Sequence, residues 1–132
     1  MPSRKLTDLA PEVREKAEAF LKKCDEAGID LLVTCTWRSD AEQAELYAQG
    51  RTKPGRVVTN AQPGQSKHNG TVAGIPASRA LDVVPLVNGK PVWGTDGEDA
   101  VLWERVGVIG ESCGLEWAGR WRRMKETAHF QG

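Results

Sequence analysis

The sequence lacks several features that would fix a class of function at once. No apolar run approaches the roughly 18 residues that a membrane span needs, and residues 1–11 lack the apolar core of a secretory signal. Lys and Arg total 18 and Asp and Glu total 18, so the formal net charge is zero. The basic surplus typical of nucleic-acid-binding proteins is therefore missing. We expect synthesis in a cytoplasm, no nucleic-acid partner and no stable membrane association.

Cysteine and histidine are both scarce. Cys24, Cys35 and Cys113 form no C-x-x-C pair, which disfavours a cysteine-based zinc site. Each lies in an apolar helical stripe or strand, so we interpret all three as small buried hydrophobic residues, with a nucleophilic cysteine as the alternative. The two histidines are His68 and His129, and any histidine chemistry must use one or both.

The remaining composition is that of one ordinary globular domain over residues 1–132, with 39% hydrophobic residues and no linker or repeat. Apolar periodicity predicts helices over residues 11–27 and 98–113. A capping box at Ser39 and Glu42 predicts a third helix that stops at Gly50. Residues 51–79 are rich in glycine and proline, and a loop of this length is usually functional or mobile. The strands we predict are residues 29–36 (a continuous, buried strand), 80–87, 91–93, 115–117 and 128–130, with an Asn88-Gly89 hairpin turn.

This order of elements predicts an α+β domain with a small, largely antiparallel sheet flanked by helices. His68 ends the glycine-rich loop, Asp82 interrupts an apolar strand and His129 lies near the last residue. Two imidazoles and a carboxylate suit a catalytic zinc that keeps one position open for water. Glu126 could then take a proton from that water and pass it to a leaving amine.

Each of these residues also has an ordinary interpretation. A loop histidine is often only polar, Asp82 could pair with an arginine, and Glu126 could pair with nearby basic residues. The spacing is no generic zinc signature, and H-E-x-x-H is absent.

Several motifs that follow one another in the chain carry a family resemblance. They are Thr36-Trp37-Arg38-Ser39, Leu46-Tyr47-Ala48-Gln49-Gly50-Arg51-Thr52, Pro63-Gly64-Gln65-Ser66-Lys67-His68, the run Arg79 to Pro85, Gly114-Leu115-Glu116-Trp117 and Glu126-Thr127-Ala128-His129-Phe130. Over about residues 30–132 the chain resembles the L-alanyl-D-glutamate endopeptidases of bacteriophage endolysins, which are zinc peptidases related to D-alanyl-D-alanine carboxypeptidases. The resemblance implies the LAS/hedgehog-type zinc peptidase fold, with the zinc site on the sheet.

The resemblance also implies roles for individual residues. His68, Asp82 and His129 match the zinc ligands, and Glu126 matches the acid/base. Arg38 matches the arginine that holds the substrate and stabilises the oxyanion. Two further positions, Ser66 and Gln43, match residues near the substrate groove.

Two departures from the family pattern affect these expectations. His68 and Asp82 are 82 − 68 = 14 positions apart, more than in the family motif S-x-H-x-x-G-x-A-x-D, which indicates an insertion within residues 70–78. Surface turns tolerate insertions, so we expect the ligands to be kept. Arg120 stands where relatives often have an acidic residue, and we expect this reversed charge near the site to alter substrate preference.

The function that the resemblance implies is a peptidoglycan hydrolase that cleaves the L-alanyl–D-glutamate bond of the stem peptide. The alternatives are a D-alanyl-D-alanine carboxypeptidase and a catalytically silent cell-wall-binding module of the same fold. A monomeric, single-domain enzyme without a separate wall-binding domain is expected. It would be made in the host cytoplasm and would reach the cell wall or periplasm through a phage holin, although a bacterial or prophage origin fits as well.

Overall fold

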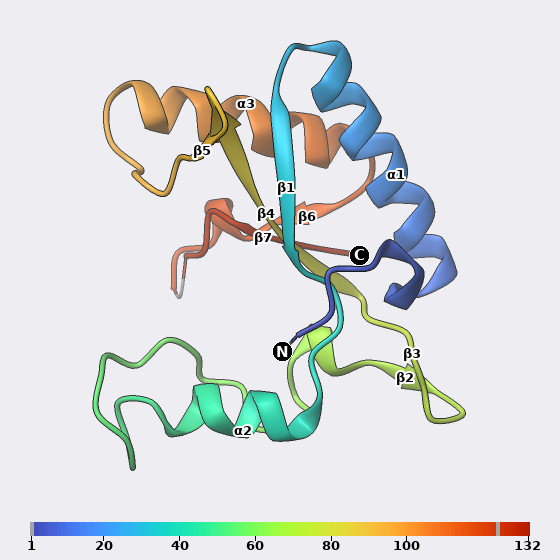
Figure 1. The fold of residues 1–132 in the computed structure, drawn as a ribbon, viewed down its shortest axis with the longest axis vertical. Helices are drawn as coiled ribbons and strands as arrows, with labels where there is room; N and C mark the ends of the chain where they lie inside the picture. Colours follow the sequence, from blue (N-terminus) through green and yellow to red (C-terminus); the bar gives the residue numbers. More distant parts are fainter. Residues whose placement is uncertain (1, 124) are drawn as a thin grey trace.

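The computed structural model describes residues 2–123 and 125–132, and these residues form three α-helices around a small sheet (Figure 1). None of the described helices is long and apolar enough to cross a membrane. The elements are η1 (Leu6–Asp8), α1 (Pro11–Glu26), β1 (Asp30–Cys35), α2 (Asp40–Ala48), η2 (Lys67–Asn69), β2 (Thr71–Val72), β3 (Ile75–Pro76), β4 (Ala80–Val87), β5 (Lys90–Pro91), α3 (Glu98–Ser112), β6 (Glu116–Trp117), η3 (Ala118–Arg120) and β7 (His129–Gln131).

The main sheet has the strand order β1-β4-β7-β6, with β5 paired to β4, and every described pairing in it is antiparallel. The α+β architecture predicted from the sequence is confirmed. Helices α1 and α3 pack on one face of the sheet, whereas α2 lies beyond the sheet next to the loop of residues 51–65 (Figure 1).

The core lies between the sheet and the two packed helices. On α1, Val13, Ala17 and Phe20 are fully buried at helical spacing. The Phe20 ring contacts Phe130 of β7 with 4.7 Å between ring centroids. Trp103 of α3 is 2% exposed and fills the other side of this core.

The second helix begins as its capping box predicts. The Ser39 hydroxyl accepts a hydrogen bond from the Glu42 amide, and the Glu42 carboxylate accepts one from the Ser39 amide. The hairpin after β4 also follows its predicted turn, since Asn88 and Gly89 both have positive φ, at 53° and 76°.

Strand β1 differs from its prediction. The continuous run Leu31, Leu32, Val33 suggested a strand buried on both faces, but β1 is an edge strand of the sheet and Leu32 is 38% exposed. The prediction was wrong because an apolar run reports hydrophobicity and does not report whether a second neighbouring strand exists.

The insertion between His68 and Asp82 forms a small hairpin of its own, β2 paired with β3. Ala73 and Gly74 make its turn with φ values of 52° and 79°. The Ala77 amide donates to the Gly70 carbonyl at 2.8 Å and closes the base of the hairpin. The hairpin projects away from the body of the molecule, so the extra residues leave the strand that carries Asp82 undisturbed (Figure 1).

Candidate metal centre

Strand alternation places Asp82 and His129 on the face of the sheet opposite the helices. Their strand neighbours Leu81 and Phe130 point into the core and are fully buried, so the intervening side chains emerge on the other face. Asp82 and His129 are also paired in register between β4 and β7. The sheet itself therefore brings a carboxylate and an imidazole together, although they are distant in the sequence.

His68 approaches the same carboxylate from η2. The Ser66 hydroxyl accepts a hydrogen bond from the His68 amide at 3.2 Å and caps this turn. The His68 carbonyl accepts from the Arg38 amide at 2.9 Å, and the Asn69 side chain donates to the Arg38 carbonyl at 2.8 Å. These bonds fix the loop that carries His68 against the segment following β1.

One oxygen of Asp82 lies between the two histidines. Asp82 Oδ1 is 3.2 Å from His68 Nε2 and 3.3 Å from His129 Nδ1, and the imidazole centroids are 5.1 Å apart. Both histidines are almost fully buried, with 2% and 7% exposure. The two predicted histidine ligands thus both contact the predicted carboxylate ligand at Asp82 Oδ1.

The outer nitrogen of each histidine is held by an acceptor. His68 Nδ1 lies 2.8 Å from the Thr36 carbonyl, which can only accept, so Nδ1 carries a proton and donates. His129 Nε2 lies 2.9 Å from Gln131 Oε1. The nitrogens left to face Asp82 are His68 Nε2 and His129 Nδ1. Two imidazole nitrogens and a carboxylate oxygen directed at one position are a donor set that fits zinc.

The same arrangement shifts the protonation of the metal-free protein. Burial would lower the pKa of His68, but its hydrogen bond with Asp82 and its contact with Cys35 outweigh burial and raise that pKa to about 10. Burial would raise the pKa of Asp82, but the two histidines hold it well below its ordinary value. These directions favour an imidazolium beside a carboxylate in the metal-free site, and a metal ion would have to compete with the imidazolium proton.

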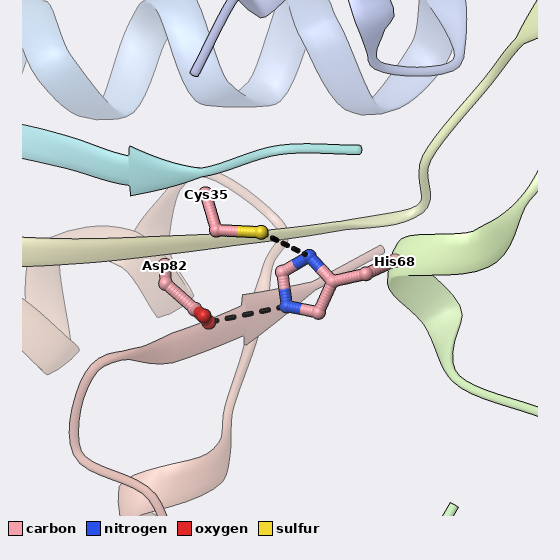
Figure 2. Close-up of side chains that lie close together, drawn as sticks. All are labelled: Cys35, His68 and Asp82. Carbon is pink, nitrogen blue, oxygen red and sulfur yellow. Dashed lines mark hydrogen bonds and ion pairs between the residues drawn. The ribbon is translucent and has the colours of Figure 1, made fainter. Parts of the chain in front are cut away.

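Cys35 also borders the site, which its sequence interpretation as a buried hydrophobic residue did not include. The side chain is 5% exposed, and a ligand atom of each of Cys35, His68 and Asp82 lies within 4.8 Å of the others. Figure 2 shows His68 between the other two, with a different ring nitrogen toward each. The thiol lies 3.5 Å from His68 Nδ1, the nitrogen that donates to the Thr36 carbonyl. Cys35 is therefore on the side of the His68 ring away from Asp82, and His129 is the better candidate for the third zinc ligand.

Arg38 borders the same carboxylate. Its Nη2 is 3.8 Å from Asp82 Oδ2, and its Nη1 donates to Gln43 Oε1 at 2.9 Å. Gln43 is fully buried and donates in turn to the Ala61 carbonyl at 2.8 Å. Gln43 therefore lies beneath the groove surface and orients Arg38. The Arg38 Nε is buried without a hydrogen-bond partner in the described structure.

A groove of about 430 Å³ opens beside this centre. Arg38, Ser66, His68, Asp82, Glu126 and His129 are among the residues that line it. Glu126 Oε2 lies 3.8 Å from His129 Nδ1, and burial raises the pKa of the Glu126 carboxyl. A carboxyl group with a raised pKa at the edge of a metal position is suited to exchange protons with a bound water.

The aromatic and basic residues of the C-terminal segment divide between groove and core. Trp121 lines the groove and lies 5.6 Å from the His129 ring, whereas Trp117 is 4% exposed and belongs to the core. Arg120 donates to Glu104 and Glu111 of α3 and stacks over Trp117. Its charge is neutralised there, and it is not among the groove-lining residues. Any effect of Arg120 on substrate preference therefore stays a prediction.

Comparisons with known proteins give family-model matches and a curated relative. Two family models described as D-alanyl-D-alanine carboxypeptidase match residues 6–88 and 59–132. The chain is 37% identical, over 129 residues, to the peptidoglycan L-alanyl-D-glutamate endopeptidase CwlK of Bacillus subtilis, covering 95% of this chain and 74% of CwlK.

Two solved structures share the fold. The Serratia marcescens L-Ala D-Glu endopeptidase ChiX has a TM-score of 0.63 at 20% identity, with 99% of this chain and 87% of ChiX covered. The LD-carboxypeptidase LdcB has a TM-score of 0.67 at 16% identity, with 93% of this chain and 58% of the LdcB chain covered.

Proposed function

Because the chain belongs to the D-alanyl-D-alanine carboxypeptidase family, we propose that it is a zinc-dependent peptidase that hydrolyses the L-alanyl–D-glutamate bond of peptidoglycan stem peptides. The observation that carries this proposal is the convergence of His68 Nε2 and His129 Nδ1 on one oxygen of Asp82 beside Glu126. The 37% identity to an endopeptidase of this specificity supports the choice of bond.

In this proposal, His68, Asp82 and His129 hold the zinc ion. The chemistry that zinc supplies at such a site is acidification of a water molecule and polarisation of a carbonyl. Glu126 accepts the water proton at its carboxylate and returns it to the leaving amine nitrogen, a task that suits its raised pKa. Arg38, oriented by Gln43, supplies planar donors for the developing oxyanion or a substrate carboxylate.

The charge of the groove supports an acidic peptide as substrate. Lys67 lines the groove and is exposed, and no acidic partner for its amine is found among the described residues. Together with Arg38 it gives the groove two cationic groups, and Asp82 and Glu126 are the carboxylates of the lining. The stem peptide carries a free carboxylate next to the scissile bond, which such groups would attract. Ser66 supports the site through its cap on the His68 turn.

One alternative, a D-alanyl-D-alanine carboxypeptidase, fits the family models at the level of the family. A digest of purified peptidoglycan, with products identified by mass spectrometry, separates the two. New L-alanine C-termini with D-glutamate N-termini, abolished by a chelator and restored by zinc, are expected. Release of D-alanine would instead establish the carboxypeptidase. No product from zinc-loaded protein would contradict both and leave a binding module.

For the biological setting, we propose an endolysin of a phage or prophage. Residues 1–132 would act as a monomeric catalytic domain that passes from the host cytoplasm to the wall through a holin. The motif resemblance supports this setting. Co-expression with a holin in a host bacterium should cause lysis, and expression of the enzyme alone should not. Lysis that does not depend on the holin would contradict the export route.

A further inference from the structure

The outer ring nitrogen of His129 is held by a side chain, whereas that of His68 is held by the main chain. The side-chain Oε1 of Gln131 lies 2.9 Å from His129 Nε2, and the Thr36 main-chain carbonyl oxygen lies 2.8 Å from His68 Nδ1. No sequence motif pointed to Gln131. The contact follows from strand geometry, because residues two apart on a strand share a face.

The strand gives this contact a fixed geometry. β7 lies between β4 and β6, and Gln131 is paired with Ala80 on one side and Glu116 on the other. His129 lies on the same strand as Gln131 and is paired with Asp82 of β4. The amide and the imidazole are thus presented side by side by backbone that is paired with β4 at both residues and with β6 at Gln131.

We propose that Gln131 is a positioning residue for the metal centre, because its Oε1 accepts the Nε2 proton of His129 and would keep it there when a metal ion takes the Nδ1 lone pair. This inference rests on the proposed metal site. An imidazole with its proton on Nδ1 would present a donor to Asp82 and could not bind a metal there. Partners of this kind typically contribute about 10–100-fold to metal affinity.

The orientation of the amide carries the inference. With Oε1 toward the ring, Nε2 of His129 must donate, which agrees with a metal at Nδ1. The reversed amide would donate to Nε2 and move the ring proton to Nδ1. The proposal therefore requires an acceptor at position 131, and a carboxylate should serve as well as an amide.

Two substitutions test this requirement. Gln131→Met keeps the length of the side chain and removes the acceptor, and Gln131→Glu keeps the acceptor. Gln62→Met is the matched control, because Gln62 is exposed and lies outside the groove lining. Zinc affinity is measured by competition with a chelator at fixed pH. We expect Gln131→Met to lose about 10–100-fold, Gln131→Glu to equal or exceed the wild type, and the control to be unchanged.

A second measurement locates the ring proton of His129. In the zinc-loaded wild type, nuclear magnetic resonance should show a protected Nε2–H of His129, and Gln131→Met should lose that protection. Equal zinc affinity in the wild type and Gln131→Met would overturn the proposal, and a higher KM alone would identify a substrate contact. If Gln131→Met does not fold, a loss of zinc affinity in Gln131→Glu, which keeps the acceptor, would overturn it. Failure of the wild type to bind zinc would instead overturn the proposed function.

Discussion

At the scale of single residues, two carboxyl groups of the groove have pKa values shifted in opposite directions. Asp82 is held below its ordinary pKa by two histidines, whereas burial raises the pKa of Glu126. A carboxylate that stays ionised suits a metal ligand, and one that protonates more readily suits proton transfer. The two environments thus favour the proposed ligand role for Asp82 and the proposed acid/base role for Glu126.

The acid/base assignment predicts the effect of Glu126→Gln. Glutamine keeps the shape of the Glu126 side chain but lacks the carboxylate that accepts the proton. We therefore expect kcat to fall about 10²–10⁴-fold while the fold remains. Zinc content, measured by atomic absorption, should match the wild type because Glu126 is not among the proposed ligands. Glu15→Gln on the exposed side of α1 is the control. Unchanged turnover would contradict the role of Glu126, and lost zinc would make it a ligand.

Sequence patterns located the residues whose type is diagnostic and missed those that act through position. The structure brings His68, Asp82, Glu126 and His129 together, as the motifs predicted. Gln131 and Cys35 were missed because an amide or a thiol in a strand has no distinctive pattern. Their relevance depends on a ring nitrogen 2.9 Å or 3.5 Å away, which only the register and packing of strands determine.

At the scale of elements, the site depends on how α3 packs against β6. An added Cβ at Gly107 of α3 would lie 2.2 Å from Cε3 of the Trp117 ring. The Trp117 indole donates to the Thr127 carbonyl at 2.8 Å, next to Glu126. The glycine therefore lets the helix approach closely enough for the indole to anchor the segment that carries the acid/base.

Gly107→Ala should accordingly destabilise the protein. Helix propensity favours alanine by about 1 kcal/mol, but a forced shift of a buried indole costs about 1–3 kcal/mol. We expect a net loss in urea unfolding together with reduced kcat. Val108→Ala, at an exposed position of the same helix, should stay within about 0.5 kcal/mol of the wild type. A stabilised Gly107→Ala variant would show that the indole moves freely.

The inserted hairpin makes the opposite prediction. Val72 and Ile75 at its tip are 68% and 67% exposed, and the Ala77–Gly70 hydrogen bond closes its base without them. Replacing residues 71–76 with a two-glycine turn should leave zinc affinity and kcat/KM unchanged. Reduced kcat/KM with normal zinc affinity would show that the hairpin contacts the substrate. The sequence located this insertion, but no periodicity in so short a segment predicted its strands.

At the scale of the whole molecule, the protonation of the metal centre couples to folding. In the metal-free protein the pKa of His68 is raised from 6.5 to about 10, so folding favours the protonated ring. That stabilisation is fully present below pH 6.5 and is lost as the pH rises toward 10. Asp82 has a lowered pKa, so its contribution is present above its ordinary pKa of 3.8 and is lost in acid.

Metal-free protein should therefore be most stable between about pH 4 and 6.5 and should weaken from pH 6.5 to 9. The zinc-loaded protein should show the opposite trend from pH 5 to 8, because zinc competes with the proton on His68 and stabilises only the folded chain. Urea unfolding with and without a chelator measures both curves. Burial raises the pKa of the Cys24 thiol to about 11, so ionisation of this thiol does not affect the curves measured below pH 9. His68→Gln should flatten the metal-free curve over this range, and a metal-free stability that rises from pH 6.5 to 9 would contradict the imidazolium–carboxylate pair.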